Sequence, residues 1–267
     1  MRRLAIIFLA ATLAGPAAAA PERVDLNLVL AVDSSSSVDP DEFALQMTGI
    51  AEAFRTPAVI EAIEGGTHHA IAVTLMEWSN ATWQRENIGW TVIHDAASAR
   101  AFADQVEDAP RLIYGGATSI SGGLRFALER LAASPTPAER AVIDVSGDGA
   151  NNQGVPVEDA RRAVLAAGVT INGLAVINEE PDLEQYYRTE VIGGPGAFAL
   201  EARDYEDFAQ AILRKILREI EAVPVARARP HVAPSGGSAG NQRDEGALEG
   251  DGRSRTTGRA PSSPPPA

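Results

Sequence analysis

The sequence has no cysteine among its 267 residues, only four histidines and a low aromatic content of 5%. Without cysteine, thiol catalysis, thiolate-ligated zinc and a disulfide framework are all excluded. Long apolar runs are also scarce. The segment at residues 4–14 is too short to cross a bilayer with ease, and no later segment is long enough either, so no membrane span is expected.

Positive charge is in the minority, because 23 Lys and Arg residues stand against 36 Asp and Glu residues, for a formal net charge of −13. Such an acidic body is a poor partner for nucleic acid or for an anionic membrane. It is compatible with cation binding, although acidity alone often serves only solubility. We therefore expect neither nucleic acid nor membrane among the partners.

The two ends of the chain differ in composition from its centre. Arg2 and Arg3 precede the apolar segment, and small residues at Ala18 and Ala20 follow it, which predicts a secretory signal cleaved after Ala20. The protein is then periplasmic or secreted. From about residue 224 the chain is rich in Pro, Gly, Ser and Arg, which is typical of disorder. The predicted organisation is a signal peptide at 1–20, one domain at 21–223 and a tail at 224–267.

Strand and helix patterns alternate through the central domain. Strands are expected at residues 24–32, 70–78, 82–93, 141–145, 169–177 and 197–200. Helices are expected at residues 41–55, 96–106, 157–167 and 183–192, from 119 or 120 onward, and along Phe208 to Ile220. The connection at residues 79–81 is too short for a parallel crossover. This pattern predicts an α/β fold, a doubly wound six-stranded sheet that is mostly parallel with one antiparallel strand and is flanked by helices.

Polar residues follow the strands at one edge of this predicted sheet. Asp33, Ser35 and Ser37 come directly after the first strand, where ligands bind in open α/β sheets. When the strand directions are followed along the chain, Thr118 and Asp148 arrive at the same edge. Carboxylates and hydroxyls without imidazole or thiol suit a hard cation, so we expect Mg²⁺, or Mn²⁺ or Ca²⁺, at these five residues.

At this set of residues the chain resembles the von Willebrand factor type A domain and its metal-ion-dependent adhesion site. The family's D-x-S-x-S motif matches Asp33, Ser35 and Ser37, its loop threonine matches Thr118, and its later aspartate matches Asp148. The resemblance covers about residues 24–223. It implies a Rossmann-like sheet, serine and threonine hydroxyls as direct ligands, and aspartates that bind the ion directly or through water.

Two details refine the resemblance. The family usually has Thr-Asp-Gly at the last loop, whereas this chain has Gly147-Asp148-Gly149, which leaves the local support of Asp148 open. Further segments resemble an uncharacterised exported bacterial branch of the family: Glu77-Trp78-Ser79, Trp90-Thr91 and residues 144–149.

Several of these residues have a second interpretation. Ser37 or Asp39 could simply cap the helix that follows the first strand. Asp144 lies inside an apolar strand, where a carboxylate needs a partner. It could support the metal loops from behind, together with Ser146, or belong to a structural network elsewhere. Both interpretations stay open from the sequence.

The histidines and tryptophans also fall into groups. His68, His69 and His94 are expected at the edge opposite the metal residues, and the fourth histidine, His231, lies in the tail. Trp78, Trp83 and Trp90 flank or lie within the predicted hairpin. They could form an exposed binding surface, although tryptophans in strands are more often packed in the core.

These features favour a binding module over an enzyme. The main hypothesis is an exported, cation-dependent module whose metal captures an Asp or Glu of a protein partner. A metal-dependent hydrolase or phosphatase is the alternative, but the metal edge has neither a histidine nor a G-x-S-x-G nucleophile motif. A third hypothesis is a scaffold with a vestigial metal site, whose function lies in the hairpin face or the tail.

Overall fold

The computed structural model describes residues 23–222. The predicted signal peptide at 1–20, the tail at 224–267 and His231 lie outside these residues. The strands are β1 (Val24–Asp33), β2 (Ile71–Trp78), β3 (Gln84–Ile93), β4 (Ala138–Gly147), β5 (Thr170–Val176) and β6 (Ala199–Ala202). The helices are α1 (Pro40–Arg55), α2 (Pro57–Glu64), α3 (Ala96–Asp108), α4 (Ile120–Ala132), α5 (Val157–Ala166), α6 (Leu183–Tyr186) and α7 (Tyr205–Glu221).

The strands form one six-stranded sheet in the order β3-β2-β1-β4-β5-β6. Every neighbouring pair is parallel except β2 and β3, which form an antiparallel hairpin. The predicted fold class is therefore confirmed. The order places β1 and β4 side by side at the centre, where Val32 pairs with Ser146 near the carboxyl ends of both strands.

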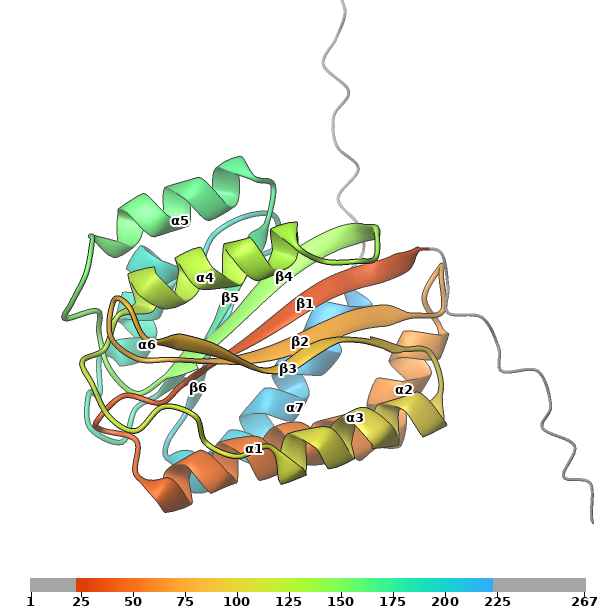
Figure 1. Cartoon of the computed structure of the whole chain (residues 1–267), viewed down its shortest axis with the longest axis horizontal. Coiled ribbons are helices and arrows are strands. Elements are labelled where there is room, and N and C mark those ends of the chain that lie inside the picture. Colours follow the sequence, from red (N-terminus) through yellow and green to blue (C-terminus); the bar gives the residue numbers. More distant parts are fainter. Residues whose placement is uncertain (1–22, 223–267) are drawn as a thin grey trace, which may run out of the picture. The chain divides into compact units, whose positions relative to one another are not determined.

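Helices cover both faces of the sheet (Figure 1). On one face, α1, α2, α3 and α7 pack over side chains such as Leu28, Leu30 and Val32 of β1. On the other face, α4, α5 and α6 pack over a second cluster that contains Val29 and Ala31. Successive residues of β1 thus serve opposite cores, which explains why this strand is apolar almost throughout.

Local sequence explains where α1 begins. The Asp39 carboxylate accepts hydrogen bonds from the N–H groups of Asp41 and Glu42, and the Glu42 side chain accepts from Asp39 N–H, so a capping box precedes the apolar stripe. Pro40 stands at the first helical position, where its missing N–H costs nothing. The cap is therefore Asp39, which leaves Ser37 available for the metal loop.

Two segments differ from the expected pattern. The short helix α2 was not among the expected helices, because its eight residues give too few turns for a clear apolar stripe. The single helix expected at 183–192 is instead the short α6 followed by a π-helical turn, Tyr187–Val191. None of the helices within residues 23–222 is long and apolar enough to cross a membrane.

Candidate metal centre

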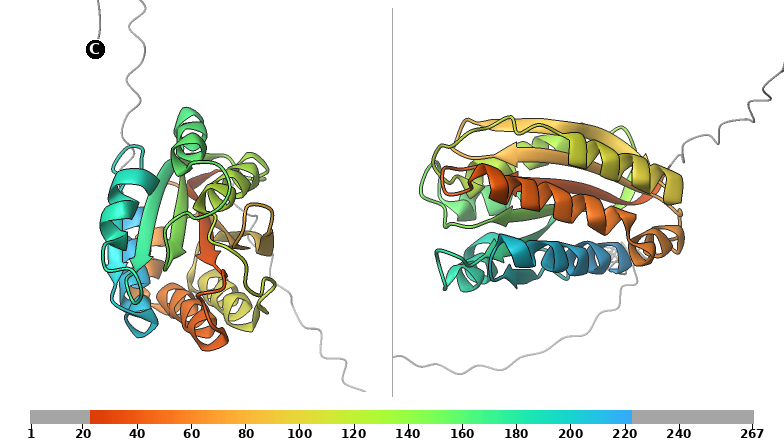
Figure 2. Two further views of the ribbon diagram at one scale, coloured as in Figure 1. Left: turned by 90° about the vertical axis from the view of Figure 1, so that its left-hand side faces the viewer. Right: turned by 90° about the horizontal axis from the view of Figure 1, so that it is seen from below.

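The candidate centre lies at the carboxyl ends of the central strands, at the left-hand edge in Figure 1 and facing the viewer in the left panel of Figure 2. Asp33 is the last residue of β1, and Asp148 directly follows β4. Thr118 lies just before α4, whose N-terminus is capped by the Ser119 hydroxyl. Parallel pairing of β1 with β4 is what brings the first two loops together.

A chain of hydrogen bonds joins four of the five predicted ligands. The N–H of Ser35 donates to Asp33 Oδ1 at 2.8 Å, and the hydroxyls of Ser35 and Ser37 lie 3.2 Å apart. The Ser37 hydroxyl donates to Asp148 Oδ1 at 2.7 Å. The D-x-S-x-S loop and the loop after β4 are therefore in direct contact through side-chain oxygens.

The fifth residue, Thr118, is held against the same loop through its backbone. Its N–H donates to Asn152 Oδ1 at 2.9 Å, and its carbonyl accepts from the Asn152 N–H at 2.9 Å. A Cβ built on Gly149 would lie 3.6 Å from the Thr118 hydroxyl, which places that hydroxyl beside the residue that follows Asp148. The structure thus brings all five residues to one edge. That they ligate a metal stays a prediction.

Two of the buried oxygen atoms without hydrogen-bond partners among the described residues belong to carboxylates of the candidate centre. Asp33 and Asp148 are 0% and 1% exposed, and the Oδ2 atom of each is buried with no hydrogen-bond partner among the described residues. Burial and the nearby charge of Asp148 raise the pKa of Asp33 to about 7. Two buried carboxylates with unpaired oxygens are unfavourable in isolation, and a cation between them would remove that cost.

The donor set is rich in hydroxyls and poor in charge. Between residues 23 and 222, no group of three or more His, Cys, Asp or Glu side chains is placed to hold a metal. The candidate centre instead combines two carboxylates with three hydroxyls. Oxygen ligands of this kind fit Mg²⁺, Mn²⁺ or Ca²⁺ better than a soft metal.

Gly147, the departure from the family's usual threonine, has a steric explanation. A Cβ at this position would lie 2.8 Å from Asp33 Oδ2, 2.9 Å from the Tyr187 hydroxyl and 3.1 Å from the Trp78 ring. On the neighbouring strand, a Cβ at Gly173 would lie 2.5 Å from the Tyr187 ring. The two glycines therefore leave a slot for Tyr187, which brings a buried hydroxyl close to Asp33.

Tyr187 could not be predicted from the sequence, since nothing in its sequence surroundings marks it as a neighbour of the centre. Its hydroxyl is buried without a hydrogen-bond partner among the described residues. Burial and the charge of Asp33 raise its pKa, and burial and Asp148 likewise raise the pKa of Tyr205. Both phenols are therefore neutral, and each lies near one carboxylate of the centre.

Two further residues that the sequence did not single out hold the loop at residues 33–38, which carries Asp33, Ser35 and Ser37. The Gln46 amide donates to the Asp33 carbonyl at 3.1 Å from inside α1. The Arg111 guanidinium donates to the carbonyls of Ser34 and Val38 at 3.1 and 3.0 Å. Together they anchor the backbone of this loop on two sides.

Asp144 belongs to a network away from the metal loops. Its Oδ1 atom lies 2.5 Å from Nζ of Lys215, which is fully buried in α7 and also contacts Glu219 at 2.9 Å. Asn172 donates to the same Glu219 oxygen at 2.9 Å. The structural network is thus the interpretation of Asp144 that the contacts favour. Ser146 is buried two residues before Asp148, and its supporting role stays a prediction.

The first three histidines lie at the opposite edge of the sheet. His68 and His69 precede β2, and His94 directly follows β3. The His68 ring is 3.1 Å from the Glu139 carboxylate, and His94 is 3.5 Å from Asp95. Their contacts are thus with surface residues of that edge.

Solved structures share this fold. Proximal thread matrix protein 1 from the mussel byssus, solved with a zinc-occupied MIDAS motif, matches with a TM-score of 0.54 and 13% identity over 76% of this chain and 50% of that one. The pilus adhesin SpaC from Lactobacillus rhamnosus GG matches at 0.54 and 14%, over 75% and 31%. A von Willebrand factor type A protein from Catenulispora acidiphila matches at 0.51 and 16%, over 74% and 43%.

These matches confirm that the fold is that of a von Willebrand factor type A domain. At such identities they show the fold alone, and this chain spans half or less of each of the three structures. The profile of the family described as "Protein of unknown function (DUF1194)" matches residues 23–224, and the chain belongs to that family. No protein with a curated description matches the sequence.

Proposed function

We propose that the protein is an exported binding module that uses a divalent cation to capture an acidic residue of a partner protein. The observation that carries this proposal is the pair of buried carboxylates, Asp33 and Asp148, each with one unpaired oxygen. Both lie among hydroxyl groups at the ligand-binding edge of the sheet. Export rests on the N-terminal sequence pattern alone.

The residues would divide the work between them. Ser35, Ser37 and Thr118 would bind the ion through neutral hydroxyls, and Asp33 and Asp148 would bind it directly or through water. Because the hydroxyl ligands are neutral and the aspartates can bind through water, a bound divalent ion would stay electrophilic enough to coordinate a carboxylate from a partner. Two of the fold relatives, a pilus adhesin and a protein with a zinc-occupied MIDAS motif, are consistent with this function.

The hydrolase hypothesis has less support. Turnover would require a positioned base or nucleophile in addition to the metal. The three described histidines lie at the opposite edge, and Tyr187 and Tyr205 are neutral because burial raises their pKa values. Capture of a carboxylate needs neither group.

The first test is metal-dependent stability. We expect Mg²⁺ or Mn²⁺ to raise the thermal midpoint of the purified protein relative to chelator, and Asp33→Ala to remove the response. Asp41→Asn is a matched control, because Asp41 is an exposed carboxylate at the start of α1. An equal response in wild type and Asp33→Ala would contradict the proposal.

The second test is partner capture. Exported proteins retained by the immobilised wild type with Mg²⁺, and lost with chelator or with Asp33→Ala, would support the function. If retention is unchanged by both treatments, the metal does not mediate binding and the scaffold hypothesis is the better one.

A further inference from the structure

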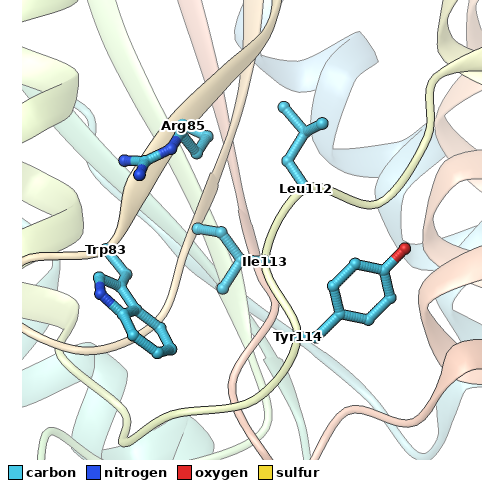
Figure 3. A pocket seen from close by; sticks show the side chains of 5 residues that line it. All are labelled: Trp83, Arg85, Leu112, Ile113 and Tyr114. Atoms are coloured by element: carbon cyan, nitrogen blue, oxygen red, sulfur yellow. The ribbon is translucent and has the colours of Figure 1, made fainter.

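A hollow of about 270 Å³ lies between the start of β3 and the segment at residues 112–114 (Figure 3). Trp83 and Arg85 stand on one side of it, Leu112 and Tyr114 on the other, and Ile113 between them. The described residues include five exposed large hydrophobic side chains, and three of them line this hollow: Trp83, Leu112 and Tyr114. Tyr114 is 73% exposed. A cluster of exposed apolar side chains is typical of a ligand-binding or protein-binding surface.

The buried carboxylate of Glu77 holds the wall of the hollow that carries Leu112 and Ile113. This side chain is 0% exposed, and its two oxygens accept hydrogen bonds from the N–H groups of Leu112 and Ile113, both at 2.8 Å. Asn87 donates to the same carboxylate and to the Pro110 carbonyl. This wall is therefore preorganised, which lowers the entropic cost of binding a partner.

The hollow is also connected to the metal loops. The guanidinium of Arg111 stacks 5.5 Å from the centre of the Tyr114 ring while it binds the carbonyls of Ser34 and Val38. Two residues after Tyr114, the N–H of Gly116 donates to the Ser36 hydroxyl at 2.8 Å.

The opposite wall reaches the centre through backbone hydrogen bonds. The N–H of Ser79 donates to the Trp83 carbonyl at 3.0 Å, and the N–H of Ser119 donates to the Ser79 carbonyl at 2.7 Å. Ser119 is the neighbour of Thr118. Both walls are thus tied to loops that carry predicted metal ligands.

Arg85 gives the hollow a charge opposite to that of the body. It is exposed, and none of the ion pairs between described residues involves it, although it donates to the Gln84 carbonyl. In a chain with a net charge of −13, such an exposed cation favours the binding of an acidic partner segment. The volume fits one bulky side chain and is small for a whole organic ligand.

We infer that this hollow is a second subsite for the partner of the metal centre. It takes a bulky apolar side chain from a partner segment whose acidic residue completes the metal site, and Arg85 pairs with a further carboxylate that flanks the apolar side chain. This inference rests on the proposed function and states the chemistry of the partner: an acidic segment with one apolar anchor.

The test is selection of a random displayed peptide library against the purified full chain in Mg²⁺. We expect enriched peptides to carry acidic residues and a bulky apolar residue at a constant spacing. Affinity of a selected peptide should fall about tenfold or more in Leu112→Ser, because a buried apolar anchor is lost. Arg85→Glu should weaken peptides with the second acidic residue, and Asp33→Ala should abolish binding.

Matched control positions lie outside the hollow. Leu45 is 39% exposed in α1 and does not line the hollow, whereas Leu112 is 44% exposed, so Leu45→Ser should leave affinity unchanged. Arg100→Glu, at an exposed position in α3, controls for the charge change of Arg85→Glu. Thermal melts of each variant exclude unfolding as the cause of lost binding.

The outcomes separate the two proposals. Metal-dependent peptides that lack an apolar anchor and bind Leu112→Ser normally would overturn the subsite and leave the proposed function intact. Peptides that need Leu112 but neither Mg²⁺ nor Asp33 would overturn the link between hollow and metal. A selection without metal-dependent peptides would count against both. A Mg²⁺-dependent dimer in sedimentation velocity that Leu112→Ser dissolves would replace the partner with a second copy of the chain.

Discussion

Within residues 23–222, two pairs of buried carboxylates differ in their counter-charge. Asp144 and Glu219 share the buried ammonium of Lys215 under α7. Asp33 and Asp148 lie at the sheet edge with hydroxyls around them, and no ammonium or guanidinium of the described residues forms an ion pair with either carboxylate. Burial raises the pKa of both Asp33 and Asp144, in the case of Asp33 to about 7. A buried ammonium of the chain therefore compensates the first pair, whereas we propose that a cation from solution compensates the second.

The two pairs are therefore expected to have different roles, one in the stability of the fold and the other in binding. A covalently attached cation cannot leave, so the pair under α7 holds the helix on the sheet at all times. A cation drawn from solution can leave and can accept a partner's ligand. The predictions below test whether the two regions differ in this way.

Removing the internal cation should have the largest effect. Lys215→Met leaves Asp144 and Glu219 without their ammonium, and loss of one partner from a buried ion pair costs about 3–5 kcal/mol. Urea denaturation should show this loss with or without Mg²⁺. The triple variant Lys215→Met, Asp144→Asn, Glu219→Gln should recover much of it. If Lys215→Met is as stable as wild type, the buried network contributes little.

Adding the external cation should stabilise the edge pair by a somewhat smaller amount. At a Mg²⁺ concentration a hundredfold above its dissociation constant, mass action predicts about 2.7 kcal/mol. For wild type, the stabilisation measured by denaturation should equal the value calculated from the dissociation constant that isothermal titration gives. Asp148→Asn should lower this stabilisation. Lys215→Met should keep its Mg²⁺ response, since its defect lies in the other region. A lost response would show that the two regions are coupled.

The pH dependence should distinguish the pairs further. The pKa of Asp33 rises from 3.8 to about 7 on folding, and burial raises the pKa of Asp144 as well, so both carboxyls bind a proton more tightly in the folded state. Stability should therefore fall as pH rises through that interval and level off above it. Mg²⁺ should offset the loss of stability that ionisation of Asp33 causes. The loss that remains in Mg²⁺ should become smaller in Asp144→Asn. Thermal midpoints measured across pH with Mg²⁺ or chelator would check this, and curves that coincide under both conditions would contradict it.

The smallest effect is expected at the phenol beside Asp33. Tyr187→Phe removes a buried hydroxyl that has no partner among the described residues, so metal-free stability should change by less than about 1 kcal/mol or increase slightly. A loss well above that value in chelator would mean that the hydroxyl has a structural partner, such as an ordered water.

The sequence predicted the edge residues because their positions follow from local rules. D-x-S-x-S is contiguous, and strand direction alone decides which edge Thr118 and Asp148 reach. The sequence also marked Asp144 as a buried charge that needs a partner. It could not name Lys215, since that contact depends on how α7 lies across the sheet.

The missing details are those that depend on packing between distant segments. Tyr187 lies near Asp33 only because Gly147 and Gly173, on adjacent strands, leave room for its ring. The grouping of Trp83 with Leu112 and Tyr114 likewise depends on the path of the chain after α3. The sequence left the tryptophans as either core or surface, and the structure shows both: Trp78 is buried, whereas Trp83 is 46% exposed.

The buried lysine has a practical consequence for chemical labelling. Lys215 is the single lysine of the chain and is 0% exposed, so the N-terminal amine is the remaining target for acylating reagents on the folded protein. Acylation of Lys215 would then report the opening of the packing between α7 and the sheet, and mass spectrometry could follow it as the modification of a single residue.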